Sequence, residues 1–153
     1  MPSFRNVRRV GHGSAEMFDL VADVERYPEF VPLCQSLQVR RRTVEAAGVE
    51  VLVADMKVGY LAIRECFTSR VTLDRAKMKI HVEYIDGPFS RLENVWTFKD
   101  EEDGTSRVEF FIDYEFRSRM LGAMMGSMFD AAFRKFASAF ERRADKVYGT
   151  AVG

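Results

Sequence analysis

The sequence predicts an α+β fold in which a curved antiparallel sheet packs against one long C-terminal helix. Between residues 36 and 116, apolar side chains recur at every second position, as in strands with one buried face. After residue 120 the repeat changes to three and four residues, the period of an amphipathic helix. The connections between the strands are short, and this favours antiparallel pairing of neighbours.

A short strand and two short helices are expected before the sheet. Residues 4–10 are predicted to form the strand, and residues 15–22 the first helix with Ser14 as its N-cap. A second helical turn near residues 25–31 is interrupted and then closed by prolines. No repeat or linker divides the chain, so residues 1–153 are expected to form a single domain.

Six further strands are expected between residues 36 and 116. Turn signals separate them at residues 47–48, 58–59, 74–75, 86–88 and 103–104. Three of these strands have clear apolar faces: Met78, Ile80, Val82 and Tyr84; Leu92, Asn94, Trp96 and Phe98; Phe110, Ile112, Tyr114 and Phe116. Asn94 and Glu65 are polar residues in register with apolar neighbours, so each needs a partner in the protein or in a ligand.

The C-terminal helix is expected from residue 120 to about residue 148. Its buried stripe is predicted to hold Phe129, Phe133, Phe136, Phe140, Ala144 and Val147. Gly122 and Gly126 each cost roughly 1 kcal/mol relative to alanine inside a helix. Two interpretations are open: close packing of the helix on the sheet, or a flexible lid over a cavity. The lid would carry four methionines: Met120, Met124, Met125 and Met128.

Composition and hydropathy exclude several classes of protein. The 153 residues carry 23 basic and 23 acidic side chains, and this balance argues against a general binder of nucleic acid or of anionic membranes. The N-terminus lacks the features of a signal peptide, and no segment is apolar enough to span a membrane. A cytoplasmic protein is expected, with Cys34 and Cys66 as buried thiols in a reducing compartment.

Six segments resemble the coenzyme Q-binding START-like family: residues 21–34 (VADVERYPEFVPLC), 65–71 (ECFTSRV), 86–89 (DGPF), 92–98 (LENVWTF), 113–116 (DYEF) and 139–149 (AFERRADKVYG). That family belongs to the START/polyketide-cyclase superfamily, and its bacterial members include the ribosome-association toxin. The chain departs from the family pattern at Leu33, where an aromatic residue is expected. The resemblance implies a helix-grip fold with a hydrophobic tunnel between the sheet and the long helix.

The resemblance further implies that the tunnel binds ubiquinone or a related polyprenyl lipid. The protein would then be a non-catalytic carrier that supports respiration and quinone biosynthesis, with no cofactor other than this ligand. Transient contact with the inner membrane would fit that role. The residues expected to line the cavity are Glu65, Met78, Ile80, Val82, Asn94, Trp96, Phe110, Ile112, Tyr114, Met124, Met125, Met128, Phe129 and Phe133. Its portal is expected to hold Tyr27, Phe30, Val31 and Leu33.

Two alternatives stay open from the sequence. The toxin-like relatives imply a ribosome-associated regulator of translation, for which the run Arg40–Arg42 is the supporting feature. A cyclase or hydrolase could use the same cavity with Glu65 as acid or base, because an apolar site raises the pKa of a carboxyl. His12 and His81 have no acid or nucleophile beside them in the sequence, and no nucleotide-binding or metal-binding motif is present.

Overall fold

The computed structural model of the chain describes residues 3–60 and 63–149. In chain order its elements are β1 (Ser3–Val10), α1 (Ser14–Ala22), η1 (Val24–Glu29), β2 (Cys34–Ala46), β3 (Val49–Tyr60), β4 (Ile63–Asp74), β5 (Lys79–Asp86), β6 (Phe89–Asp100), η2 (Glu102–Gly104), β7 (Ser106–Phe116) and α2 (Arg119–Tyr148). The predicted α+β fold is confirmed. None of the described helices is long and apolar enough to cross a membrane.

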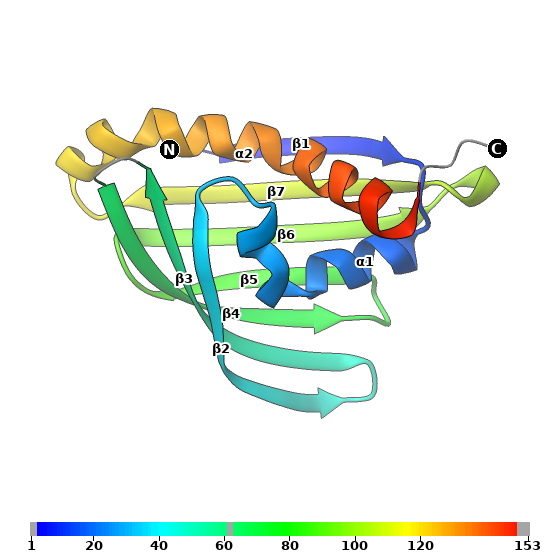
Figure 1. The fold of residues 1–153 in the computed structure, drawn as a ribbon. Coiled ribbons are helices and arrows are strands. Elements are labelled where there is room, and N and C mark those ends of the chain that lie inside the picture. Colours follow the sequence, from blue (N-terminus) through cyan, green and yellow to red (C-terminus); the bar gives the residue numbers. More distant parts are fainter. Residues whose placement is uncertain (1–2, 61–62, 150–153) are drawn as a thin grey trace.

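The strands form one antiparallel sheet in the order β1-β7-β6-β5-β4-β3-β2. The first strand of the chain therefore pairs with the last, and this pairing places β1 beside α2 (Figure 1). The turn predicted at residues 58–59 was misplaced, because β3 continues to Tyr60 and Gly59 pairs with Arg64 of β4. Met78 was expected on the apolar face of a strand, but β5 begins at Lys79, since Met78 adopts φ 49° in the preceding turn.

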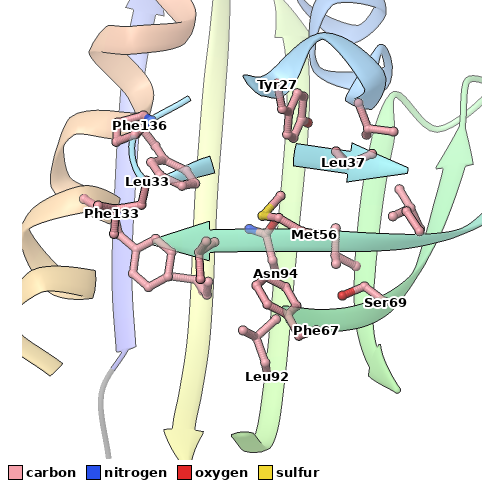
Figure 2. Close-up of a pocket in the computed structure, with 18 of the residues that line it drawn as sticks. Tyr27, Leu33, Leu37, Met56, Phe67, Ser69, Leu92, Asn94, Phe133 and Phe136 are labelled. Carbon is pink, nitrogen blue, oxygen red and sulfur yellow. The ribbon is translucent and has the colours of Figure 1, made fainter. Parts of the chain in front are cut away.

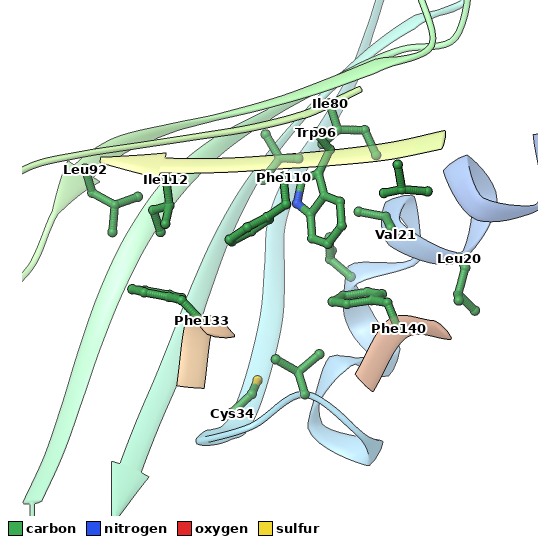
Figure 3. Packing of buried hydrophobic residues seen from close by; sticks show 14 of the residues in the cluster. Leu20, Val21, Cys34, Ile80, Leu92, Trp96, Phe110, Ile112, Phe133 and Phe140 are labelled. Carbon is green, nitrogen blue, oxygen red and sulfur yellow. The ribbon is translucent and has the colours of Figure 1, made fainter. Parts of the chain in front are cut away.

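Helix α2 crosses the inner face of the curved sheet, and α1 and η1 lie on the same side (Figure 1). Its aromatic stripe meets the sheet residues directly: the ring of Phe140 is 4.9 Å from that of Trp96, and Phe133 faces Phe110 (Figure 3). Val147 was wrongly assigned to this stripe, because it is 51% exposed. Ala144 is the last enclosed residue of the stripe, and the final turn of α2 extends beyond the core.

The beginning of α1 is capped by a carboxylate from the sheet. Ser14 was predicted as the N-cap residue, but Gly13 takes that position and contributes no side chain. The backbone N–H of Ser14 donates instead to Oδ1 of Asp100, at the end of β6, over 2.8 Å. This hydrogen bond holds the pKa of Asp100 below its usual range. The same hydrogen bond fixes the start of α1 to the end of β6.

The turn before α1 holds the end of α2 in place. His12, which is 4% exposed, lies 2.7 Å from Asp145 Oδ1 through its Nε2 atom. The hydroxyl of Tyr148 donates to the backbone oxygen of Glu16 over 3.1 Å. The C-terminal half of α2 is thus held by polar contacts as well as by its aromatic stripe.

Candidate functional site

A cavity of about 110 Å³ lies between the inner face of the sheet, α2 and the segment that joins η1 to β2 (Figure 2). Its lining is Val24, Tyr27, Pro32, Leu33, Leu37, Ala54, Met56, Val58, Phe67, Ser69, Val71, Ile80, Val82, Leu92, Asn94, Trp96, Ile112, Phe129, Ala132, Phe133, Phe136 and Phe140. The resemblance implies a hydrophobic tunnel between the sheet and the long helix, and this cavity lies in that position. An apolar cavity of about 150 Å³ holds a benzene molecule, so this space is on the scale of one ring.

Strand alternation explains why β3 and β4 contribute so much of the wall. Ala54, Met56 and Val58 are alternate residues of β3, and their side chains point into the cavity. Their direct partners on β4 are Ser69, Phe67 and Glu65, and the first two of these also line the cavity. A small residue at position 54 and another at position 69 leave space that larger side chains would fill.

The cavity wall is almost entirely apolar. Two polar side chains from the sheet line it, Ser69 and Asn94, which are 6% and 9% exposed. Nδ2 of Asn94 donates to the backbone oxygen of Phe111 over 2.8 Å, so this amide has one partner within the protein. The hydroxyl of Tyr27 donates to the backbone oxygen of Val21, and its enclosure raises the pKa of Tyr27 above its usual value.

Part of the lining is only partly buried: Tyr27, Pro32, Leu33, Leu37, Met56, Phe67, Val82 and Phe136. Leu33 has φ 68°, a left-handed conformation that is unfavourable for a residue with a branched side chain. Its backbone oxygen accepts a hydrogen bond of 3.0 Å from Gly59 of β3, which holds this loop against the sheet. In that conformation the Leu33 side chain reaches toward Phe133 and Phe136 of α2 (Figure 2).

The structure brings together nine of the residues predicted for the site. The predicted cavity residues that line the cavity are Ile80, Val82, Asn94, Trp96, Ile112, Phe129 and Phe133, joined by the predicted portal residues Tyr27 and Leu33. They come from η1, the loop after it, β5, β6, β7 and α2. The convergence of five elements on one space is what a ligand pocket requires.

Phe110 and Tyr114 lie on the inner face of β7 but are packed as ordinary core. The ring of Phe110 contacts Phe136, and that of Tyr114 lies 5.2 Å from Phe133, so α2 covers both positions. Met78 is partly buried in the turn before β5 and is not part of the cavity wall. These three residues share the buried side of the sheet with the cavity without lining it.

The methionines of α2 do not form a lid over the cavity. Met120 and Met124 are 72% and 52% exposed, Met125 is buried in the core, and Met128 is partly buried beside it. None of the four is among the cavity-lining residues of the described chain.

The glycines of α2 are not explained by close packing either. A Cβ atom at Gly126 would meet nothing within 4 Å, and one at Gly122 would make an ordinary 3.9 Å contact with Phe116. Both glycines instead face an open groove at the start of α2, beside Arg117 and Arg119. The packing interpretation of these glycines is therefore wrong.

Phe30 and Val31 belong to the scaffold beside the portal. The ring of Phe30 packs edge-on against Phe140 at 5.0 Å, and the guanidinium of Arg143 lies over its other side. Val31 is 5% exposed and is part of the main core. These contacts hold the loop that carries Leu33, but neither side chain lines the cavity.

The cavity lacks an acid–base residue. Within the described residues its lining contains no carboxylate, imidazole, amine, guanidinium or thiol. Glu65 is partly buried next to Val58 at the end of the sheet and stays outside the lining. His81 contacts Glu93 on the outer face of the sheet, and Cys34 lies in the core, so the structure does not form a Cys34–His81 nucleophile–base pair.

The arginine run lies on the edge strand β2. Arg40 pairs with Asp55 of β3, and Arg42 reaches Glu25 and Glu50 over 3.2 Å each. Arg41 is exposed and has no partner among the described residues. Two of the three positive charges are therefore neutralised within the protein.

The sequence analysis missed the contribution of β2, β3 and β4 to the cavity. Residues not predicted for the site include Leu37, Ala54, Met56, Val58, Phe67, Ser69 and Val71. The signal that could have found them is their alternation: residues 54, 56 and 58 and residues 67, 69 and 71 each point to the same face. Ser69 is distinctive as a polar residue between two apolar ones on that face.

The comparison with protein families matches the chain to the family described as polyketide cyclase/dehydrase and lipid transport, over residues 10–141. The chain belongs to this family. Among curated relatives, the ribosome association toxin RatA of Vibrio cholerae is 34% identical over 140 residues, which cover 92% of this chain and 93% of that protein. The mitochondrial coenzyme Q-binding protein COQ10 homolog B of Xenopus laevis is 29% identical over 144 residues, 92% of this chain and 57% of the longer relative.

Solved structures of this family share the fold. The 18 kDa protein CC1736 of Caulobacter crescentus is 35% identical, with a TM-score of 0.79 over 98% of this chain and all of that one. A START superfamily protein of Mycobacterium smegmatis has a TM-score of 0.78 over 95% and 98%, at 16% identity. The ZhuI aromatase/cyclase of a Streptomyces species reaches 0.75 over 99% and 98%, at 17% identity. The last two show the fold alone, and the predicted START-like helix-grip fold is confirmed.

Proposed function

We propose that the protein is a non-catalytic binder of ubiquinone or a related polyprenyl lipid, which it holds in the cavity between α2 and the sheet. The observation that carries this proposal is the cavity wall, which is apolar except for a few hydroxyl, amide and indole groups. Burial of apolar ligand surface supplies affinity at about 25 cal/mol per Å² before the costs of binding. The Xenopus laevis relative is named as a coenzyme Q-binding protein, and this name is in keeping with such a ligand.

A carrier role fits the chemistry of the wall better than catalysis does. General acid–base catalysis needs a titratable group within hydrogen-bond reach of the reacting atom. The described cavity wall offers a hydroxyl, a carboxamide, an indole and a phenol whose pKa is raised, and none of these is a base at neutral pH. The cavity can orient and enclose a ligand, as required for carrying it.

The size of the cavity indicates how the ligand would enter. A space of about 110 Å³ is smaller than the roughly 300–1,000 Å³ of most ligand pockets. One ring fits with small side-chain shifts, whereas a polyprenyl tail needs Leu33, Leu37 and Phe136 to move or must leave between them. These three residues are partly buried, and Leu33 lies in a loop rather than in the sheet, which favours movement on this side.

Trp96 makes the proposal directly testable. It is the single tryptophan of the chain, is 3% exposed and lines the cavity. A quinone bound beside it should quench its fluorescence, so a short-tailed ubiquinone titrated into the protein should give saturable quenching at one ligand per chain. Quenching that rises linearly with quinone concentration, as for free tryptophan in solution, would contradict the proposal.

Two alanines of α2 provide a matched pair of variants. Ala132 lines the cavity and is 6% exposed, whereas its neighbour Ala131 is exposed. Ala132→Leu should fill the cavity and weaken quinone binding at least about tenfold, equivalent to 1.4 kcal/mol. Ala131→Leu should leave the titration unchanged, and thermal melts of both variants verify that overpacking has not unfolded the protein.

A second candidate function is association with the ribosome. The observation that favours it is the similarity to the Vibrio cholerae relative, which is named as a ribosome association toxin and is 34% identical. Arg41 is exposed and has no ion-pair partner in the described part of the chain, and it offers a contact for phosphate. Sedimentation with large ribosomal subunits that is lost at moderate salt and in Arg41→Ala, together with no response of Trp96 to quinone, would favour this function.

A further inference from the structure

The hydroxyl of Ser69 is buried against the cavity and has no hydrogen-bond partner among the described residues. Its side chain is 6% exposed, and its neighbours on the inner face are Ala54 of β3 and Tyr84 of β5. A buried hydroxyl without a partner destabilises the folded state, because it has lost its hydrogen bonds to water. A serine that pays this cost at the wall of an otherwise apolar cavity is suited to a ligand that supplies the partner.

Ser69 and Asn94 face the same space from two strands that are separated only by β5. Ser69 pairs with Tyr84 and Asn94 pairs with Val82, so the two side chains lie on nearly adjacent rows of the sheet. Neighbouring strands are about 4.8 Å apart and each residue advances about 3.4 Å along a strand, so the two residues, two strands and two positions apart, are about 12 Å from each other. Two hydrogen bonds of about 2.8 Å leave roughly 6 Å between them, close to the separation of two oxygen atoms on opposite sides of a six-membered ring.

We propose that Ser69 and Asn94 form a two-point hydrogen-bonding site for a single ring that carries oxygen atoms on opposite sides. This assignment rests on the proposed function and deepens it: the ring lies against the sheet, and the tail leaves past Leu33 and Phe136. Ser69 is then a specificity residue that separates oxygen-bearing rings from plain isoprenoid hydrocarbons. The cavity volume, which is on the scale of one ring, agrees with this orientation.

The chemistry of the two side chains suits both redox forms of such a ring. A serine hydroxyl donates one hydrogen bond and accepts others, so it can face a carbonyl or a hydroxyl oxygen. The carboxamide of Asn94 has a second N–H and an oxygen beyond the N–H donated to Phe111. A quinone and its quinol should therefore bind with similar affinity, which would allow a carrier to hold either form.

The test compares two probes and two serine variants. The probes are a short-tailed ubiquinone and an oxygen-free isoprenoid hydrocarbon of similar tail length, each measured by displacement of an apolar fluorescent dye. Ser69→Ala should weaken binding of the quinone about tenfold and leave binding of the hydrocarbon unchanged. Ser106→Ala is the matched control, because the Ser106 hydroxyl is also buried without a partner but lies outside the cavity lining. It should change neither affinity.

The outcomes distinguish failure of the two-point site from failure of the proposed carrier function. If the wild-type protein binds the quinone and Ser69→Ala binds it equally well, the two-point site is overturned while the carrier function stands. If the wild-type protein binds neither probe, both fail. Removal of an unpaired hydroxyl should not lower the melting temperature, so a loss of quinone binding in folded Ser69→Ala reports on the ligand contact.

Discussion

At the scale of single residues, burial separates the two cysteines. Cys34 lies in the core at the start of β2, and desolvation raises the pKa of its thiol to about 11. Cys66 points outward from β4 and is exposed, so the expectation that both thiols are buried is wrong for Cys66. Because thiolates are the reactive form, the position of a cysteine in this fold should decide its reactivity.

Labelling of the native protein with a thiol reagent at pH 8 should therefore modify one cysteine per chain in the fast phase. The second thiol should react only in denaturant, and Cys66→Ser should abolish the fast phase. Equal rates for both thiols would mean that the loop before β2 opens far more readily than its contacts indicate.

The residue scale also shows which site positions could be predicted. Ile80, Val82 and Ile112 line the cavity as their alternation predicted, but Phe110 and Tyr114 share that alternation and are covered by α2. Periodicity identifies which face of a strand is buried. Whether a residue on that face lines the cavity depends on which side chains of other elements pack against it. Leu33 illustrates the same limit, because its left-handed backbone conformation has no signature in the local sequence.

At the scale of elements, the carboxylate of Asp100 links α1 to β6. Its pKa is lowered in the folded state, so its stabilising effect is present above the ordinary value of 3.8 and is lost as the pH falls through the folded value. Asp100→Asn should flatten the acid limb of the stability curve below about pH 4. Urea unfolding at several pH values measures this slope.

Asp103→Asn is the control for that experiment, because it removes a carboxylate from the next loop without affecting the cap of α1. It should keep the wild-type slope. An acid limb that is equally steep in Asp100→Asn and the wild-type protein would show that the hydrogen bond to Ser14 contributes nothing to folding.

The groove along the first turns of α2 gives a second prediction at this scale. Gly126→Ala should raise the free energy of unfolding by about 1 kcal/mol, because alanine is the better helix former and an added Cβ meets nothing within 4 Å. Ala123→Gly, on an exposed position of the same segment, should lower it by a similar amount. Denaturant melts measure both changes, and destabilisation by Gly126→Ala would contradict the open groove.

At the scale of the whole molecule, the architecture followed from patterns that extend over many residues. The period-two segments between residues 36 and 116 and the long aromatic stripe of α2 correctly predicted a sheet that covers one helix. The expected methionine lid was wrong, because a lid depends on the packing of individual side chains such as Met124 and Met125. The sequence does not predict that Ser69 and Asn94 face the same cavity, because this depends on the strand order, in which β5 lies between β4 and β6.

The apolar cavity is also what connects the fold to its proposed role. Helix α2 is fixed at its C-terminal end by His12 and by the contact of Tyr148 with α1, while its middle, at Phe133 and Phe136, lines the cavity. Ligand entry can thus be accommodated by side chains of α2 and of the loop that carries Leu33 without separating the helix from the sheet. A carrier needs side chains that can move to admit the ligand while the helix and the sheet stay in place.

The central claim is that this cavity binds a quinone, and extraction tests it most directly. The protein would be purified from a host that makes ubiquinone, extracted with organic solvent and analysed by mass spectrometry, beside Ala132→Leu and Ala131→Leu prepared in the same way. The account predicts near-stoichiometric quinone in the wild-type protein and in Ala131→Leu, and little in Ala132→Leu. Equal amounts in all three, or no quinone in the extracts and no saturable quenching of Trp96 when quinone is added, would contradict it.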